Sequence, residues 1–480
     1  MPIAFLFLRF DTLFLRAIVI VVIIAMCVPL TSGNTYYIAM NGDDTNPGTE
    51  SWPWLTIQKA ANTMVAGETV YVMTGTYSEH VVTKKSGTSN NDIKFVVYPG
   101  ETVTISGGGF YVDKNFITID GFNFVNGGTA IDIIPRPPGG GNNITIRNNK
   151  MVSIFSDAPF RYGWYDKAYG DGHNLILENN DIEALPGSAR IEAATLSGLD
   201  GFIVRDNTFA NANGEGLNMK DNTKNGKVYN NTFKPSSQAV LYFDARGTVS
   251  NIDVYNNIIK AAAVLQNEDN DIRYNYTAVI DNISIYNNIF YGGNSSLRVG
   301  PFYIRGVNVA GTIKNVRIIN NDFEGTYGVD VGGGLPKVEN VIIRNNIFSN
   351  TGMSVLSGTV TIDHNIMFNT PCVGTNYIAQ YPEFVNPAGG DFHLQSTSPA
   401  IDRGSPIGAP GMDFDWNLRP QGFGYDIGAF EFHNIMAVQN DTGNNNTIGK
   451  SGIEHAVIDY FHNIITKVME TVWAFFRRYI

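Results

Sequence analysis

The sequence predicts an all-β protein wound as a right-handed parallel β-helix, a solenoid of about ten to twelve coils. Three observations lead to this fold class. A strand-like segment that ends in paired Asn recurs along the chain. No helical pattern fills the intervals between the copies. Only 16% of the 480 residues are charged while 50 are Gly, a composition poor in the residues that cover helical surfaces.

The repeat aligns at the second Asn of each pair. Its nine copies are Ile144–Asn149, Leu175–Asn180, Phe202–Asn207, Gly226–Asn231, Ile252–Asn257, Ile283–Asn288, Val316–Asn321, Val341–Asn346 and Val360–Asn365. From residue 149 to residue 365 is 216 residues over eight intervals, a mean of 27. Most copies alternate apolar and polar residues, which indicates a strand with one buried face. The Asn pair then turns the chain, because Asn tolerates left-handed backbone.

The length of the interval selects the architecture. An antiparallel sandwich would show turns every ~8–12 residues. A propeller is the alternative, but its blade signatures and four-strand units are missing. In a solenoid the Asn side chains should stack from coil to coil. We therefore expect Asn231, Asn257 and Asn288 to be buried and bonded between coils, and Asn257→Leu to cost about 1–3 kcal/mol.

Composition excludes several classes of protein. A hydrophobic fraction of 43% excludes disorder throughout. Lys and Arg number 33 against 44 Asp and Glu, a net charge of −11, which argues against a nucleic-acid partner. The two cysteines, Cys27 and Cys372, are too few for a disulfide scaffold or a zinc site of several thiolates.

Residues 1–33 are predicted to be a signal peptide or a signal anchor. Arg9 and Arg16 precede the apolar run 17–28, and small residues follow it. The run is shorter than a membrane span of ~20 residues. An uncleaved anchor and lipidation at Cys27 are the alternatives. The expected localisation is secreted or cell-surface.

The ends of the solenoid need covers for their exposed cores. At the front, Trp52–Met64 is predicted to be a short amphipathic helix before the first coil, and the β-helix with this cap is expected to span 34–380. At the back, 381–433 loses the repeat and is predicted to be a C-terminal cap region. Within it, Asp413–Asn417 carries alternating oxygen side chains, as a calcium loop does, but a capping turn is favoured because no acidic ligand follows.

The chain ends with a predicted polar linker, 434–450, and an amphipathic helix, 451–480. Apolar residues recur in that helix at spacings of three and four, and they form one stripe. Its charged residues make it too polar to span a bilayer. It can lie on a membrane surface, join a partner helix or fold back on the solenoid, and the sequence leaves all three open.

Several segments resemble the secreted β-helix proteins of the pectate-lyase-like superfamily. At the front these are Asn41–Gly48, Trp54–Ala60 and Gly75–Tyr77; at the back they are Ser398–Gly404, Asn417–Pro420 and Tyr425–Glu431. The resemblance covers about residues 34–433 and implies the fold and export. It is weak for chemistry, because that superfamily includes lyases, hydrolases, epimerases and adhesins. It also implies that polysaccharide binds on a parallel-sheet face.

Three strands place polar residues in two outward columns. The segments Leu217–Lys220, Leu241–Asp244 and Leu265–Glu268 align without gaps at a spacing of 24, with Leu facing inward. The fourth positions then read Ala194, Lys220, Asp244, Glu268, Arg305 and Gly332. The second positions read Glu192, Asn218, Tyr242, Gln266, Tyr303 and Asp330. Trp164 is expected to wall one end, and neighbouring loops add Glu215, Arg246 and Asp269.

The predicted function is cleavage of an acidic polysaccharide by a uronate lyase, with Lys220, Asp244 and Glu268 as catalytic residues. A lyase needs a base for the proton α to a carboxylate and a cation that neutralises that carboxylate. The resemblance implies Lys or Arg as base, hence Lys220, with Arg305 or Arg246 as the clamp. The other column residues, Asn218, Tyr242, Gln266, Tyr303, Glu215, Glu192 and Trp164, are expected to bind substrate.

A bound Ca²⁺ is one possible cofactor. Asp244 beside Lys220 favours the ammonium form, which cannot act as a base. A calcium ion held by Asp244, Glu268 and Asp269 would offset this effect, although the full acidic cluster of a pectate lyase is not found.

Three alternatives remain open. Asp244 and Glu268 on adjacent coils would lie on the order of 5 Å apart, as in a retaining glycosidase. The protein can instead be a non-catalytic surface adhesin that binds glycan. Opposite charges on adjacent strands can also merely favour strand pairing, by ~0.2–1 kcal/mol per pair.

Overall fold

The computed structural model describes residues 33–433, except 137–138, 154–157, 164–171, 186–191, 212–213, 236–238, 261, 268–277, 293–295, 300–310, 326–327 and 333–336. These residues belong to the first of two units of the chain, 1–433 and 434–480. The predicted leader up to residue 32, the linker and the C-terminal amphipathic helix lie outside the described residues. Among the described helices, none has the length and apolar character needed to cross a bilayer.

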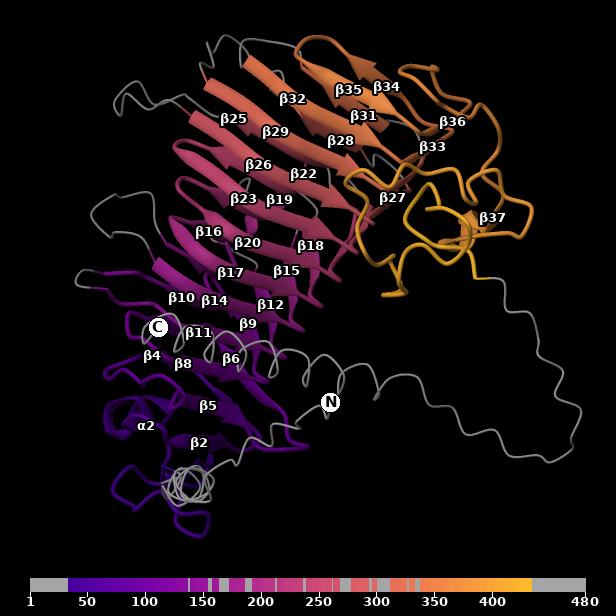
Figure 1. The fold of residues 1–480 in the computed structure, drawn as a ribbon. Coiled ribbons are helices and arrows are strands. Elements are labelled where there is room, and N and C mark those ends of the chain that lie inside the picture. Colours follow the sequence, from indigo (N-terminus) through magenta and orange to yellow (C-terminus); the bar gives the residue numbers. More distant parts are fainter. Residues whose placement is uncertain are drawn as a thin grey trace, which may run out of the picture. The chain divides into compact units, whose positions relative to one another are not determined.

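Three long parallel sheets run the length of the described fold (Figure 1). The 13-stranded sheet contains β1 (Thr35–Ile38), β2 (Thr69–Val72), β5 (Ile93–Val97), β8 (Ile117–Asp120), β11 (Ile144–Arg147), β14 (Gly172–Glu178), β17 (Leu199–Arg205), β20 (Lys224–Tyr229), β23 (Thr248–Tyr255), β26 (Ala278–Tyr286), β29 (Gly311–Ile319), β32 (Lys337–Arg344) and β35 (Val360–Asp363).

The 12-stranded sheet contains β3 (Gly75–Tyr77), β6 (Val103–Ser106), β9 (Asn123–Gly127), β12 (Lys150–Ser153), β15 (Asp181–Ala184), β18 (Thr208–Asn211), β21 (Thr232–Phe233), β24 (Ile258–Ile259), β27 (Ile289–Tyr291), β30 (Asp322–Glu324), β33 (Ile347–Ser349) and β36 (Ile366–Phe368). The 11-stranded sheet contains β4 (His80–Val82), β7 (Gly109–Val112), β10 (Ile131–Ile133), β13 (Phe160–Tyr162), β16 (Glu192–Ser197), β19 (Glu215–Lys220), β22 (Ala239–Ala245), β25 (Ala262–Asn267), β28 (Ser296–Val299), β31 (Gly328–Val331) and β34 (Met353–Val355).

Each coil visits the 13-stranded, the 12-stranded and then the 11-stranded sheet before it returns to the first. Within the three long sheets, neighbouring strands come from successive coils and pair in parallel, as β20 pairs with β17 and β23. The predicted right-handed parallel β-helix is therefore confirmed. The predicted repeat supplies the strand of the 13-stranded sheet and the turn into the 12-stranded sheet.

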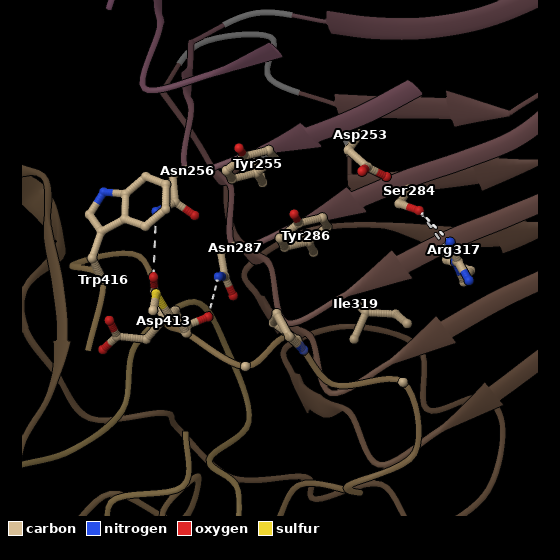
Figure 2. A pocket seen from close by; sticks show the side chains of 14 residues that line it. Asp253, Tyr255, Asn256, Ser284, Tyr286, Asn287, Arg317, Ile319, Asp413 and Trp416 are labelled. Carbon is tan, nitrogen blue, oxygen red and sulfur yellow. Dashed lines mark hydrogen bonds between the residues drawn. The ribbon is translucent and has the colours of Figure 1, made fainter. Parts of the chain in front are cut away.

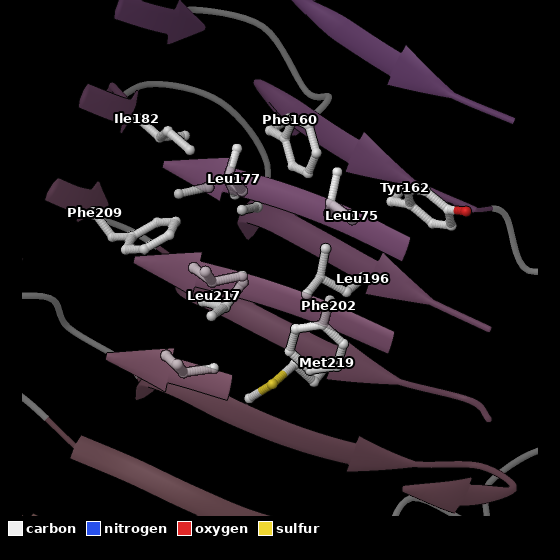
Figure 3. Close-up of a cluster of buried hydrophobic side chains, with 14 of the residues drawn as sticks. Phe160, Tyr162, Leu175, Leu177, Ile182, Leu196, Phe202, Phe209, Leu217 and Met219 are labelled. Atoms are coloured by element: carbon white, nitrogen blue, oxygen red, sulfur yellow. The ribbon is translucent and has the colours of Figure 1, made fainter. Parts of the chain in front are cut away.

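The inward faces of the three sheets share one apolar core. In β23, Ile252 and Val254 are fully buried, while Asp253 and Tyr255 between and after them point outward. Figure 3 shows Phe160, Leu196 and other side chains from successive coils meeting in that core. Alternation along each strand thus fixes which residues remain on the outer faces and are available for function.

The two Asn of each turn have different structural roles. The first takes left-handed backbone, as Asn256 does with φ 54°. The second points inward and is buried: Asn231, Asn257 and Asn288 have at most 1% of their surface exposed. Asn257 donates to Asn288 Oδ1 at 2.9 Å and accepts from Asn231 Nδ2 at 3.0 Å. These bonds repeat from Asn149 to Asn365 and tie consecutive coils together.

The N-terminal helix is shorter than expected. The helix α2 spans Ile57–Thr63, and Thr56 caps it by accepting from the Lys59 amide. The predicted first turn is not helical because the Asp44 carboxylate binds the amides of residues 55 and 56. The side chain of Trp54 instead stacks on Tyr36, with ring centroids 4.5 Å apart.

Residues 384–432 pack on the flank of the coils. The short antiparallel pair β37 (Phe384–Asn386) and β38 (Asp391–Leu394), with the 3₁₀ turn η2 (Pro387–Gly389), belongs to this segment. An apolar cluster joins the segment to Ile289, Ile347 and Ile366 on the outward side of the 12-stranded sheet. Outward Asn side chains, such as that of Asn287, donate to its carbonyls.

Candidate functional site

Polar and charged side chains gather on the outward face of β16, β19 and β22 in the 11-stranded sheet. The sheet places Lys220 opposite Asp244 and Asn218 opposite Tyr242. This is the register that the 24-residue spacing predicts, because both strands have an inward Leu at the same position. The two outward columns of this pair of strands are therefore present.

The register to β25 differs from the prediction. Asp244 lies opposite Gln266, and Phe243 lies opposite Leu265. The expected alignment of Asp244 with Glu268 is therefore wrong by two residues. A shift of two keeps every side chain on its own face, so alternation does not distinguish the two registers.

The register to β16 also differs. Ser197 lies opposite Lys220, where Ala194 was expected. Glu192, which was expected opposite Asn218, lies opposite Glu215. The physical reason is that Ala194 suits either face of a sheet, and here it is fully buried in the core. The polar group on β16 thus includes Thr195 and Ser197, which the sequence analysis missed.

Beyond β25 the strand in this sheet is β28, not a strand ending at Arg305. Arg298 of β28 lies opposite Asp330 and donates to its carboxylate at 3.1 Å. Both segments alternate apolar and polar residues, which explains the error. The predicted site residues Trp164, Glu268, Asp269, Tyr303 and Arg305 lie outside the described residues, as does the side chain of Gln266.

The Glu192 carboxylate links the first two strands. Its Oε1 accepts from Lys220 Nζ at 2.6 Å and from Asn218 Nδ2 at 3.2 Å. Its Oε2 accepts from Thr195 Oγ1 at 2.6 Å. Glu215 Oε2 accepts from the same Asn218 Nδ2 at 3.3 Å. Two carboxylates, one amide and one ammonium therefore form a connected network, which we call the polar cluster together with Asp244 and Arg246.

The polar cluster is more buried than an outward sheet face suggests. The side chain of Lys220 is 1% exposed and that of Asp244 is 3% exposed. Asp244 Oδ2 accepts from an Arg246 guanidinium nitrogen at 3.1 Å, and the Arg246 side chain is 31% exposed. Although both positions lie on an outward sheet face, the side chains of Lys220 and Asp244 are therefore shielded from solvent. Arg246 and Glu192 are the more accessible members of the cluster.

Charge in the cluster holds Glu192 ionised. Burial opposes ionisation of this carboxyl, but the Lys220 ammonium, the hydrogen bonds from Lys220 and Thr195 and the Arg246 charge outweigh it, so the pKa of Glu192 lies below its usual value. By reciprocity Glu192 favours the ammonium form of Lys220. Any proton transfer through Lys220 has to work against this pairing.

A metal site does not emerge from the described side chains. Within them, no group of three or more His, Cys, Asp or Glu is arranged to hold a metal ion. Asp244 binds Arg246 instead, and a bound cation would compete with that guanidinium. Glu268 and Asp269 lie outside the residues that the structure describes. The calcium site therefore stays a prediction.

The N-terminal half of the fold matches a known family. Residues 36–237, which include β16 and β19, match the family described as "Pel9A-like, right handed beta helix region". The chain is also 31% identical over 206 residues to "Uncharacterized protein YwoF" of Bacillus subtilis (strain 168), a match covering 39% of this chain and 44% of that protein. The chain thus matches less than half the length of this relative.

Solved structures share similar architecture at low identity. The complex of XylC with xylose aligns with a TM-score of 0.48 and 11% identity, covering 83% of this chain and 98% of that one. Pectate lyase Pel9A aligns with a TM-score of 0.41 and 15% identity, covering 84% of this chain and 98% of that one.

Proposed function

We propose that this chain is an exported carbohydrate-active protein that cleaves an acidic polysaccharide by β-elimination at the polar cluster. The observation that carries the proposal is the gathering of Lys220, Arg246 and three carboxylates on one outward sheet face. The match to a family named after Pel9A, a pectate lyase, supports this class of reaction. The apolar N-terminal segment supports export.

Elimination makes two chemical demands. A base takes the proton α to the uronate carboxylate, and the electron pair of that C–H bond forms a C=C bond. The glycosidic C–O bond breaks, and its oxygen takes up a proton from water. A cation stabilises the negative charge that develops on the carboxylate. Arg246, 31% exposed and anchored by Asp244, is suited to the cation's role.

Lys220 is the proposed base. It must first release its own proton, and burial assists that release whereas Glu192 opposes it. Activity should therefore rise toward alkaline pH, as the ammonium form disappears. Glu192, Asn218 and Glu215 are proposed to bind sugar hydroxyls and to position the Lys220 amine.

The test is incubation of the full chain with a panel of acidic and neutral polysaccharides. Ultraviolet absorbance of unsaturated uronates and new reducing ends should appear together. A matched control is Lys227→Gln, an exposed lysine on β20 in the 13-stranded sheet, which should keep full activity. Absence of unsaturated product across the panel would refute the lyase proposal.

A second candidate function rests on a specific observation. Glu192 and Glu215 lie on adjacent strands, and both accept a hydrogen bond from Asn218 Nδ2 at 3.2 and 3.3 Å. Their bonded oxygens are thus close enough for a retaining glycosidase, whose carboxyl groups lie ~5–5.5 Å apart. Ionised Glu192 would then be the nucleophile and Glu215 the acid. Reducing ends without ultraviolet absorbance would favour this candidate.

A further inference from the structure

A cavity lies on the outer side of the 13-stranded sheet, and no residue of the polar cluster lines it. Its floor is made by outward side chains of β23, β26 and β29, and its opposite wall is the segment 408–416 (Figure 2). The volume is about 440 Å³, within the usual range of small-molecule pockets, ~300–1,000 Å³.

Two Asn residues with left-handed backbone attach the wall to the edge of the sheet. Asn256 Nδ2 donates to the Phe414 carbonyl at 2.8 Å, and Asn287 Nδ2 donates to the Met412 carbonyl at 2.7 Å. These bonds anchor one edge of the wall beside the Asn turns. The space between wall and sheet is therefore part of the folded structure and does not need to open.

Aromatic rings line one side of the cavity. Tyr255 and Tyr286 line it. They stack on each other and on Tyr229 of the preceding coil, which lies outside the lining, with ring centroids 4.9 Å apart. Trp416 meets Tyr255 edge-on at 6.0 Å and is 39% exposed. The φ of Trp416 is 66°, a strained value for a bulky residue, and such strain is common at binding sites.

Polar groups with unused bonding capacity face the same space. Asn256 is 3% exposed, and its Oδ1 is buried with no hydrogen-bond partner. A buried acceptor without a partner is unusual in a folded protein, and water or a ligand hydroxyl that enters from the cavity can satisfy it. Among the described residues, the Asp253 carboxylate and the Tyr255 and Tyr286 hydroxyls also make no hydrogen bond (Figure 2).

The two phenols keep their protons. Burial raises the pKa of both Tyr255 and Tyr286 well above the ordinary value. Each hydroxyl therefore both donates and accepts at neutral pH. On the same floor, Arg317 of β29 pairs with Ser284, two residues before the position that pairs with Tyr286. Its side chain is exposed and donates to Ser284 Oγ at 2.7 Å, which leaves other guanidinium hydrogens available.

We propose that this cavity binds one end or one short segment of an oligosaccharide, apart from the polar cluster. Sugars combine apolar C–H faces with a dense set of hydroxyls, and the cavity offers aromatic surface beside Asp253, Asn256 and Arg317. The choice of carbohydrate as ligand class rests in part on the proposed function. The cavity and its unpaired acceptors do not depend on that proposal.

The experiment measures binding of xylotetraose and of a galacturonate tetrasaccharide to the full-length protein by calorimetry. To prevent turnover, all variants are made in the Lys220→Gln/Glu192→Gln background, which removes both charges of the buried pair. Asp253→Asn and Arg317→Gln change partly or fully exposed side chains and should fold normally. At least one of them should weaken binding about tenfold or more, since a hydrogen bond to a charged group is lost. Lys227→Gln, in the same outward column as Asp253, is the matched control.

Two results would overturn the inference. One is that neither tetrasaccharide binds, and the other is that both bind with affinity unchanged by either cavity variant. Loss of binding in Trp416→Ala as well, with a retained melting temperature, would support the aromatic contribution. The lyase proposal is tested separately, by whether the protein with an intact Lys220 forms unsaturated product.

Discussion

The change Asn257→Leu tests the stacking that holds the coils together. Asn257 donates to the Val228 and Tyr255 carbonyls and to Asn288 Oδ1, each at 2.9 Å. It accepts from the Asn231 amide at 2.9 Å and from Asn231 Nδ2 at 3.0 Å. Leucine has a similar volume but can make none of these five bonds.

The expected cost follows from counting the groups left without partners. The Asn231 amide loses its acceptor, and the two carbonyls lose a donor in a place that water does not reach. Each such buried group costs about 1–3 kcal/mol. Apolar contacts of the new side chain offset part of the sum. We therefore expect a loss of unfolding free energy on the order of 3–6 kcal/mol. This is more than the loss of about 1–3 kcal/mol expected from the sequence, because the structure shows three backbone groups that lose a partner.

The assay is urea-induced unfolding, monitored by intrinsic fluorescence. The control is Asn251→Gly. Asn251 is exposed, donates to Asn225 Oδ1 at 3.0 Å and accepts from Asn282 Nδ2 at 2.9 Å. Water can replace both exposed bonds, and the φ of 56° suits Gly. We expect this control to change stability by no more than about 0.5 kcal/mol. A loss below about 1 kcal/mol in Asn257→Leu would refute the argument that these buried bonds hold the coils in register.

Four further predictions concern pH, the chain end and calcium. Burial raises the pKa of Asp322 to about 8, so the folded state holds a proton that the unfolded chain releases above about pH 4. The contribution of Asp322 to the unfolding free energy should therefore fall by about 1.4 kcal/mol per pH unit from pH 5 to 7, and Asp322→Asn should remove this contribution from the slope measured in urea titrations. The hydrogen bond to Asp415, opposed by burial and assisted by Asp391, raises the pKa of His393 to about 9. Protonated His393 therefore stabilises the fold fully below about pH 6.5, and this contribution is lost as the pH rises through about 9. The melting temperature should fall less steeply between these pH values in His393→Gln than in wild type. Deletion of 434–480 should leave the melting temperature almost unchanged but alter membrane association or oligomeric state, and a large loss of stability would show that the segment covers the fold. If a calcium ion assists the cleavage, a chelator should abolish activity and added Ca²⁺ should restore it; activity indifferent to both would remove calcium from the proposal.

The fold was predictable because its signal recurs. Nine copies of one strand and turn fix the coil length, and the inward and outward faces follow from alternation. The paired Asn is a local signal with a specific backbone meaning, since the first residue takes the left-handed conformation. The short helix at the front was placed correctly but began late, because the Asp44 carboxylate binds the amides of the predicted first turn.

The candidate site was predicted only in part. Alternation identifies a face but does not distinguish registers that differ by two residues, so Lys220 opposite Asp244 was predictable and Gln266 opposite Asp244 was not. The burial of Lys220 was also unpredictable, because an outward sheet position does not by itself mean contact with solvent.

The stacked tyrosines of the cavity on the 13-stranded sheet have a signal in the sequence. Tyr229, Tyr255 and Tyr286 each precede an Asn pair, in three successive copies of the repeat. In a parallel β-helix such a position must form a stack. The wall residue Trp416 was not predictable, because it comes from a segment far along the chain that packs on the flank of the coils.

The most direct test of the central claim locates elimination chemistry at the polar cluster. Wild type, the double variant Lys220→Gln/Glu192→Gln and the control Lys227→Gln are incubated with the best substrate of the panel, and mass spectrometry distinguishes unsaturated from saturated ends. The double variant removes both charges of the 2.6 Å ion pair, so neither is left buried alone. We expect unsaturated product from wild type and from the control, and a rate at least about 100-fold lower from the double variant. Saturated ends from wild type, or undiminished elimination by a folded double variant, would contradict the account.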